Sequence, residues 1–284
     1  MGTTLEFKPR GSFEPIADMV GGGPFELEPG QWTDDTSVAL CLATSLVQCR
    51  GVDVADQMRR YVRWHRDGYL SSTGRCFDIG NTVRSALLRF ERTGEPLSGS
   101  TDPRTAGNGS IMRLAPVPMY YAADPSKAAE MAAQSSRTTH GAAEAVDACR
   151  LFSLMIVGAL TGAPREDILF GHRPGRADEN EWAPAILELS AGGYREKRRN
   201  EIKGSGYVVD SLEAALWCFL NTDSFADAVL AAANLGDDAD TTAAVCGQLA
   251  GAHYGAAAIP KTWLQKLSLH DSIVELSDAL MAGP

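Results

Sequence analysis

The sequence predicts an all-α protein, and two observations lead to that prediction. Apolar residues recur at helical spacing along most of the chain; in SVALCLATSLV, for example, Val38, Leu42 and Leu46 share one face. Alanine is abundant, whereas sustained runs of alternating β-branched residues are scarce, so helix propensity agrees with the pattern. No linker divides the 284 residues. Length alone favours neither one large domain nor two.

Ten segments carry the helical pattern, and Gly- and Pro-rich stretches such as GGGP, EPLSGSTDPRTAGNGS, HRPGRADEN and KGSG separate them. The most apolar segment, LFSLMIVGAL at residues 151–160, is shorter than the roughly 17 to 25 residues of a membrane-spanning helix, so we predict a buried core helix there. The predicted helices are residues 34–50, 53–67, 78–93, 124–137, 140–161, 181–191, 209–221, 223–234, 240–254 and 271–281.

Composition and charge exclude several classes of partner. The formal net charge of −10 argues against binding to nucleic acid or to an anionic membrane, because phosphate contacts need clustered Lys and Arg. The first ten residues contain no apolar signal segment, and six cysteines without CxxC spacing are typical of reduced, buried thiols. These features predict a cytoplasmic protein. The absence of a long exposed heptad pattern predicts a monomer.

Two acidic motifs lie far apart in the sequence, QWTDDTSVAL at residues 31–40 and LGDDADTTAAV at residues 235–245. Each places carboxylates and threonine hydroxyls directly before an apolar stretch. Thr and Asp are preferred at helix N-termini, because their oxygens accept hydrogen bonds from unpaired backbone N–H groups and complement the helix dipole. Taken alone, either motif is explained by an ordinary helix cap.

The number of oxygen side chains favours a metal site instead. A cap needs one such oxygen, and crowded like charges are unfavourable unless a cation is nearby. Carboxylate and hydroxyl oxygens without His or Cys prefer Mg²⁺, Mn²⁺ or Ca²⁺ to zinc. We therefore predict that the two helix starts face each other and hold a pair of ions. The oxygen side chains are those of Thr33, Asp34, Asp35, Thr36, Asp237, Asp238, Asp240, Thr241 and Thr242.

The stretch GNGSIMR, residues 107–113, is a candidate anion-binding loop. Two glycines flank Asn108, so the backbone can turn tightly and point its N–H groups at an anion. A Gly/Asn/Ser cluster is more often a simple turn, which leaves that alternative open.

Other stretches offer single polar groups. In FDIGNTV, Asp78 and Asn81 flank a glycine at a predicted helix start, where an Asp cap is the alternative. His140 lies at a helix boundary and can cap, pack or contact a ligand. Tyr207 can stack on a base, although core packing is the commoner role of a tyrosine.

Together these stretches resemble the ADP-ribosylglycohydrolase family, which includes the dinitrogenase reductase-activating glycohydrolase and the ADP-ribosylarginine and ADP-ribosylserine hydrolases. Several motifs in one order are more specific than any single match. The resemblance implies that residues 1–284 form a single compact multi-helical domain, with two divalent cations, Mg²⁺ or Mn²⁺, at the base of an ADP-ribose cleft. It covers essentially the whole chain and runs through MGTTLEF, WTDDTSVAL, CFDIGNT, GNGSIMR, RTTHG, GYVVDSLEAALW and LGDDADTTAAVCGQLAGAHYG.

The resemblance also implies roles for individual residues. Glu6 would approach the scissile ribose, and the GNGS amides would hold the diphosphate, with His140 nearby and Tyr207 at the adenosine end. The implied metal ligands are Thr33, Asp34, Asp35, Asp238, Asp240 and Thr241. The implied catalytic residues are Glu6, Asp34, Asp35 and Asp78, and the implied ADP-ribose contacts are Asn81, Gly107, Asn108, Gly109, Ser110, His140 and Tyr207.

The chain departs from the family pattern in three places. Family members usually begin with a glycine-rich helix that ends in GDALG or GDAMG, whereas this chain starts at the Met of that motif. The second motif has DDADT where many relatives have GDTDT, but Ala239 stands at a position that supplies no ligand. Asp237 replaces a frequent glycine and adds a charge.

The implied function is that of a metal-dependent hydrolase that removes ADP-ribose from a modified protein. The bond cleaved would be the glycosidic bond at C1 of the ribose distal to adenine. The DIGN element favours an N-linked arginine; O-linked serine, free ADP-ribose derivatives and a non-catalytic ADP-ribose-binding protein remain alternatives. A phosphohydrolase of the HD type is disfavoured, because histidine is scarce and the single His-Asp dipeptide, His270-Asp271, lies near the C-terminus.

Overall fold

The computed structural model describes residues 1–171 and 182–283. Within these ranges the chain is helical, and only three isolated β-bridges occur. The prediction of an all-α fold is confirmed. The α-helices are α1 (Asp34–Cys49), α2 (Val54–Asp67), α3 (Asn81–Thr93), α4 (Pro116–Tyr120), α5 (Pro125–Arg137), α6 (Ala143–Leu160), α7 (Arg165–Phe170), α8 (Pro184–Ser190), α9 (Val208–Leu220), α10 (Phe225–Ala233), α11 (Ala239–Tyr254), α12 (Lys261–Lys266) and α13 (His270–Met281). The 3₁₀ turns are η1 (Gly2–Leu5), η2 (Pro103–Thr105), η4 (Arg199–Glu201) and η5 (Ala256–Ala258).

The differences from the predicted helices have local causes. Helix α3 begins three residues later than predicted, because Asp78 has a left-handed φ of 59° and Gly80 takes the N-cap position. The short helices α4, α7 and α12 were missed, since five or six residues cannot display a helical period. The predicted loop at residues 172–180 lies outside the described residues, as does the predicted first residue of α8.

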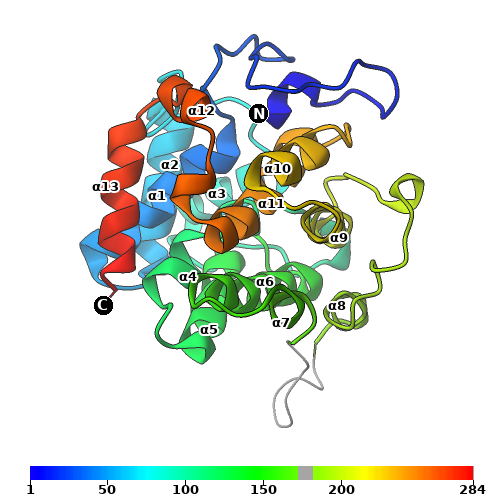
Figure 1. Cartoon of the computed structure of the whole chain (residues 1–284). Helices are drawn as coiled ribbons and strands as arrows, with labels where there is room; N and C mark the ends of the chain where they lie inside the picture. The colour runs from blue at the N-terminus through cyan, green and yellow to red at the C-terminus, as the bar shows by residue number, and fades with distance from the viewer. Residues whose placement is uncertain (172–181, 284) are drawn as a thin grey trace.

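Helix α11 is the centre of the packing. It contacts α1, α6, α9 and α10, and α6 packs in turn against α5. In Figure 1 it lies near the middle of the view, with α9 and α10 beside it. The turn η1 also packs on α11, at its first residue. Gly2 approaches Ala239 so closely that a Cβ on Gly2 would stand 2.1 Å from the Ala239 carbonyl oxygen, so only glycine fits there.

The apolar segment at residues 151–160 forms the second half of α6 and is mostly buried, as predicted. Among the described residues, no helix is long and apolar enough to span a membrane. The prediction of buried thiols is only partly right. All six cysteines are free, but Cys49 is exposed and Cys76 is half-buried.

Candidate active site

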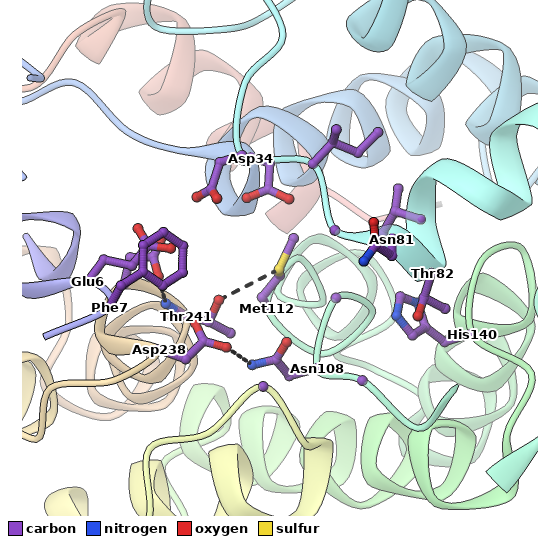
Figure 2. Close-up of a pocket in the computed structure, with 18 residues that line it drawn as sticks. Glu6, Phe7, Asp34, Asn81, Thr82, Asn108, Met112, His140, Asp238 and Thr241 are labelled. Carbon is purple, nitrogen blue, oxygen red and sulfur yellow. Dashed lines mark hydrogen bonds between the residues drawn. The ribbon is translucent and has the colours of Figure 1, made fainter. Parts of the chain in front are cut away.

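A cleft of about 390 Å³ lies where the first residues of α1, α3 and α11 meet the loop at residues 107–113. Figure 2 shows Glu6 and Asp238 toward one end of this cleft, and Asn81 and His140 toward the other. Eleven of the predicted site residues line it: Glu6, Asp34, Asp78, Asn81, Gly107, Asn108, Gly109, His140, Asp238, Asp240 and Thr241.

The two acidic motifs meet in the folded chain. The Thr33 hydroxyl donates to Asp240 Oδ2 at 2.8 Å and also lies 3.1 Å from Asp35 Oδ2. Thr33 and Asp240 are separated by 207 positions in the sequence. Thr33, Asp35 and Asp240 also line a second cavity of about 230 Å³, which shares Asp240 with the cleft. The expected convergence of the two helix starts is therefore present.

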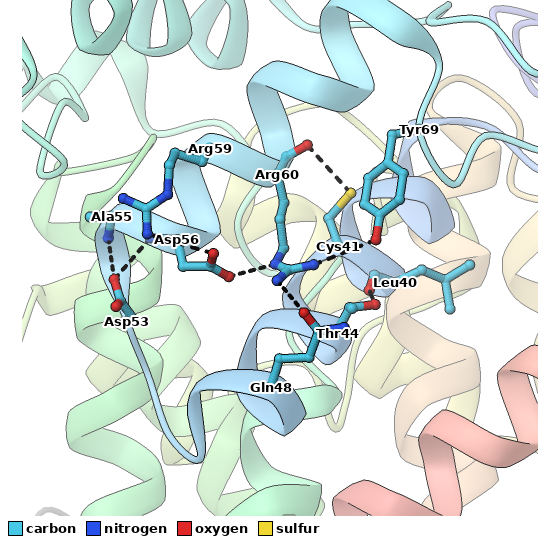
Figure 3. Close-up of polar contacts among 10 residues, drawn as sticks. All are labelled: Leu40, Cys41, Thr44, Gln48, Asp53, Ala55, Asp56, Arg59, Arg60 and Tyr69. Atoms are coloured by element: carbon cyan, nitrogen blue, oxygen red, sulfur yellow. Dashed lines mark hydrogen bonds and ion pairs between the residues drawn. The ribbon is translucent and has the colours of Figure 1, made fainter.

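At the three helix starts of the cleft, the N-cap side chain forms no capping hydrogen bond. Thr33 and Asp238 stand at the N-caps of α1 and α11, but neither side chain accepts a hydrogen bond from its own helix, and α3 begins after Gly80. Helix α2, by contrast, has a side-chain cap. Asp53 accepts from the backbone N–H groups of Ala55 and Asp56 at 2.9 and 2.8 Å (Figure 3). The cap interpretation is thus wrong for the N-cap side chains of Thr33 and Asp238, although Asp240 Oδ1 accepts from the Thr241 N–H within the first turn of α11 at 2.8 Å.

The carboxylates form a crowded cluster. Glu6, Asp78 and Asp240 each place one oxygen within 4.8 Å of the others. Six acids make up the cluster and form no salt bridge with any residue that the structure describes: Glu6, Asp34, Asp35, Asp78, Asp238 and Asp240. Burial first, and then neighbouring carboxylates, raise the pKa of the carboxyl groups of Glu6, Asp34, Asp35, Asp78 and Asp238.

Two buried oxygens in the cluster have no hydrogen-bond partner among the described residues, Glu6 Oε2 and Asp35 Oδ1. Buried polar atoms are rarely left unpaired, because each one loses its hydration without compensation. An all-oxygen donor set with this excess of negative charge fits hard divalent cations. The cluster can therefore hold metal.

A strained backbone places Glu6 at the cleft. Phe7 has a φ of 61° and Asp237 a φ of 56°, both in the left-handed region that non-glycine residues rarely adopt. The two backbone segments are joined by hydrogen bonds: the Phe7 N–H donates to the Asp237 carbonyl at 2.8 Å, and the Asp237 N–H donates to the Lys8 carbonyl at 2.9 Å. The Asp237 side chain is exposed. Its backbone, through these hydrogen bonds, ties the Glu6 segment to the start of α11.

Asn108 joins the glycine loop to the acidic cluster. Its Nδ2 donates to Asp238 Oδ2 at 2.8 Å, and its N–H donates to the Gly206 carbonyl at 3.1 Å. Gly107 forms a β-bridge with Tyr207, a residue that is 37% exposed and does not line the cleft. The loop is thus held between the start of α9 and the start of α11.

Ser110 lies on the far side of its loop. Its hydroxyl accepts a hydrogen bond from the Ser136 hydroxyl at 2.9 Å and is buried next to Cys149. The side chain does not line the cleft, which leaves its backbone amide as the group that can face a ligand.

The sequence matches the ADP-ribosylglycohydrolase family over residues 1–284. The chain belongs to this family. It is 46% identical over 283 residues to the ADP-ribosylarginine hydrolase Tri1 of Serratia proteamaculans, with 99% of this chain and 75% of that protein aligned. It is 30% identical to the ADP-ribosyl-[dinitrogen reductase] glycohydrolase of Rhodospirillum rubrum, with 99% and 91% aligned. A solved structure titled ADP-ribosylglycohydrolase-related protein complex matches with a TM-score of 0.86 and 42% identity, covering 99% of this chain and 92% of that one.

Several residues of this glycohydrolase cleft were not predicted from the sequence. Phe7 lines the mouth and is 66% exposed, and Met112 places its sulfur 4.0 Å from the Thr241 hydroxyl. Arg113 is fully buried beneath the glycine loop. The sequence around these residues does not indicate that they lie at a cleft, because long-range packing determines where their side chains lie.

Proposed function

We propose that this glycohydrolase cleaves the N-glycosidic bond that joins ADP-ribose to an arginine side chain of a modified protein. The observation that carries the proposal is the hydrogen bond between Thr33 and Asp240, because it brings the two acidic motifs into one site. The 46% identity to a protein named as an ADP-ribosylarginine hydrolase supports arginine as the acceptor.

The two ends of the cleft suit the two parts of the substrate. The backbone amides from Gly107 to Ser110 would bind the diphosphate, as glycine-rich turns do for anions. Asn81 and Asp78, at the start of α3, would hydrogen-bond the distal ribose near the acidic cluster. Binding energy from the remote diphosphate would then orient the scissile bond.

The acidic cluster would hold two divalent cations, Mg²⁺ or Mn²⁺. Bound cations would supply positive charge that lowers the pKa values of the surrounding carboxyls and polarises water and ribose hydroxyls. The residues that would bind them are Thr33, Asp34, Asp35, Asp238, Asp240 and Thr241, with oxygens of Glu6 and Asp78 close to Asp240.

In the hydrolysis, Asp34 is the better placed of the two adjacent aspartates to act as general base, since it lines the cleft and Asp35 does not. Its carboxylate would accept one proton from the attacking water, whose oxygen forms the new bond to C1 as the C1–N bond breaks. Glu6, which lines the cleft close to Asp78 and Asp240, would donate one proton to the departing guanidine.

A double substitution tests this function. Asp34→Ala together with Asp240→Ala should abolish release of ADP-ribose from an ADP-ribosyl-arginine peptide and lower the bound metal found by elemental analysis, with helical circular dichroism unchanged. Full activity in the double variant would refute the proposed site.

The acceptor is tested separately with the wild-type protein. An ADP-ribosyl-arginine peptide should be hydrolysed in preference to a matched ADP-ribosyl-serine peptide. Faster release from serine would move the activity to O-linked substrates, and binding of ADP-ribose without turnover of either peptide would indicate a non-catalytic binding protein.

A further inference from the structure

A buried arginine lies under the glycine loop, held by neutral groups. Arg113 is 1% exposed, and no carboxylate of the described residues forms a salt bridge with it. Its Nη1 donates to the Gly109 carbonyl at 2.7 Å, its Nη2 donates to the Thr139 hydroxyl at 2.8 Å, and its guanidinium carbon lies 4.8 Å from the centre of the Tyr61 ring. Hydrogen bonds and the aromatic face therefore hold a cation that no carboxylate in residues 1–171 and 182–283 pairs with.

Thr139 connects this arginine to His140. The Thr139 oxygen lies 2.8 Å from Arg113 Nη2 and 2.9 Å from His140 Nδ1. A guanidinium has donors only, so the hydroxyl must accept from Arg113. Its single proton is then free to point to the other neighbour, Nδ1 of the imidazole.

The opposite arrangement, with the imidazole proton on Nδ1, is disfavoured by the surroundings. Thr139 is fully buried, and its hydroxyl forms no third hydrogen bond within residues 1–171 and 182–283. A proton on Nδ1 would leave the hydroxyl proton buried without an acceptor, which costs free energy. Burial and the neighbouring Arg113 also lower the pKa of His140 to about 3, so the ring is neutral at physiological pH. The proton of the neutral ring therefore belongs on Nε2.

The Nε2 atom faces the cleft beside the two loop glycines. A Cβ built on Gly107 would stand 3.4 Å from Nε2, and one built on Gly109 would stand 3.2 Å from it. His140 lines the cleft, and no described residue accepts a hydrogen bond from Nε2. A neutral donor thus points into the cleft next to the amides of the loop, above a buried positive charge.

We infer that Arg113 and Thr139 are positioning residues, which fix His140 as a neutral Nε2–H donor to a diphosphate oxygen of the bound ADP-ribose. The contact with diphosphate rests on the proposed function, whereas the tautomer follows from the hydrogen bonds of the protein alone. A neutral donor keeps its proton over the whole physiological pH range, so the anion end of the cleft would bind its ligand independently of pH.

The tautomer is tested by long-range ¹H–¹⁵N correlation NMR on the ligand-free protein with ¹⁵N-labelled histidine. The chain has 5 histidines, and His140→Gln identifies the resonances of His140. We expect the pattern of an Nε2-protonated neutral ring that does not change between pH 5 and pH 8. A ring protonated on Nδ1, or one that titrates near pH 6.5, would overturn the inference, and this measurement needs no variant of Thr139.

Two substitutions at Thr139 test the positioning role. Thr139→Val removes the hydroxyl at nearly constant side-chain volume, and Thr139→Ser keeps it. We expect Thr139→Val to shift the His140 nitrogen signals and to weaken ADP-ribose binding about tenfold while kcat changes little, and Thr139→Ser to restore both. Unchanged nitrogen signals and affinity in Thr139→Val would contradict the inference.

Ligand titrations separate this inference from the proposed function. Inorganic pyrophosphate should shift the His140 Nε2 signal, and adenosine should not; the reverse result would place His140 at the nucleoside and overturn the diphosphate contact. If the NMR pattern and the pyrophosphate shift are found but no ADP-ribosyl-arginine is hydrolysed, the proposed function fails and the positioning role stands.

Discussion

The two ends of the cleft are built on opposite electrostatic principles. At one end, six carboxyl groups crowd together without a salt bridge to the described residues, and burial and mutual repulsion raise the pKa values of most of them. At the other end, the buried guanidinium of Arg113 has no carboxylate partner within the same part of the chain, and burial keeps His140 neutral. Ionised carboxylates at the first end are therefore disfavoured unless a cation is added, whereas the second end holds a positive charge without an acidic partner among the described residues.

The difference explains how an acidic protein can bind a diphosphate. The formal net charge of −10 is distributed so that the cation-binding end and the anion-binding end of one cleft stay separate. Asn108 stands between them and is neutral: its Nδ2 donates to Asp238, and its loop faces His140. An uncharged amide at this position satisfies the carboxylate without adding a charge to either end. Substrate and metal together would neutralise both ends.

Removing one charge from the acidic end should produce the largest effect. Asp240→Asn keeps the shape of the side chain, but it removes the acid that Thr33 contacts and that lies within 4.8 Å of Glu6 and Asp78. We expect kcat/KM for ADP-ribosyl-arginine to fall about 10³-fold, which corresponds to about 4 kcal/mol, with a matching loss of bound metal by elemental analysis.

Asp237→Asn is the matched control for that change. Asp237 is exposed and has a left-handed φ of 56°, a conformation that asparagine tolerates well. Its kcat/KM should stay within about twofold of the wild type, since an isolated surface charge contributes little. Equal losses in both variants would show that overall charge, and not the cluster, controls activity.

Adding a charge at the junction should break the separation of the two ends. Asn108→Asp replaces the amide donor to Asp238 by a carboxylate at a distance of 2.8 Å. Repulsion from Asp238 and from the diphosphate should raise the Kd for ADP-ribose in the presence of Mg²⁺ about 100-fold, or about 2.7 kcal/mol. Isothermal titration calorimetry measures this, and Asn221→Asp, an exposed asparagine outside the cleft, should leave the Kd unchanged.

The acidic end should also make the metal-free protein less stable as pH rises. Burial and nearby carboxylates raise the pKa of Asp238 to about 6 and that of Asp78 to about 8, whereas an unfolded Asp has a pKa of about 4. Between pH 4 and pH 8 the folded state therefore binds more protons than the unfolded state, and raising the pH favours unfolding. In EDTA, Tm should fall by about 4 °C from pH 5 to pH 8 on account of this cluster.

Two controls attribute that pH dependence to the cluster. Saturating Mg²⁺ should restore Tm at pH 8, because cations stabilise the ionised carboxylates. Asp78→Asn combined with Asp238→Asn should flatten the dependence in EDTA. A Tm that rises between pH 5 and pH 8 in the wild type, and in the double variant alike, would show that other groups dominate.

The acidic end was largely predictable from the sequence, and the anion end was not. Runs such as TDDT and DDADTT hold more oxygens than caps require, so a shared site for Thr33 and Asp240 could be inferred from residue types alone. The positions of Glu6 and Asp78 depend instead on left-handed residues at 7, 78 and 237, which no local propensity predicts.

At the anion end, neighbouring residues with similar chemistry have opposite roles. Ser110 lies in the candidate anion-binding loop, yet its hydroxyl points toward Ser136. Arg113 and Thr139, for which the sequence predicted no role, are linked by hydrogen bonds to His140. Which side of a loop a side chain occupies depends on the helices beneath it, here α5 and α6, and a single sequence does not specify that contact.

The smallest expected effect comes from one methyl group at the anion end. A Cβ on Gly109 would stand 2.8 Å from His140 Cε1, closer than real contacts allow, whereas a Cβ on Gly107 would stand 3.4 Å from Nε2, at the edge of ordinary contact. Gly109→Ala should therefore displace the His140 ring and weaken ADP-ribose binding about fivefold, or about 1 kcal/mol, while Gly107→Ala should change the Kd less than twofold. Bound metal should be the same in both variants, because the acidic end is untouched. A larger loss of affinity in Gly107→Ala would mean that the loop backbone, and not the position of His140, sets the strength of the anion end.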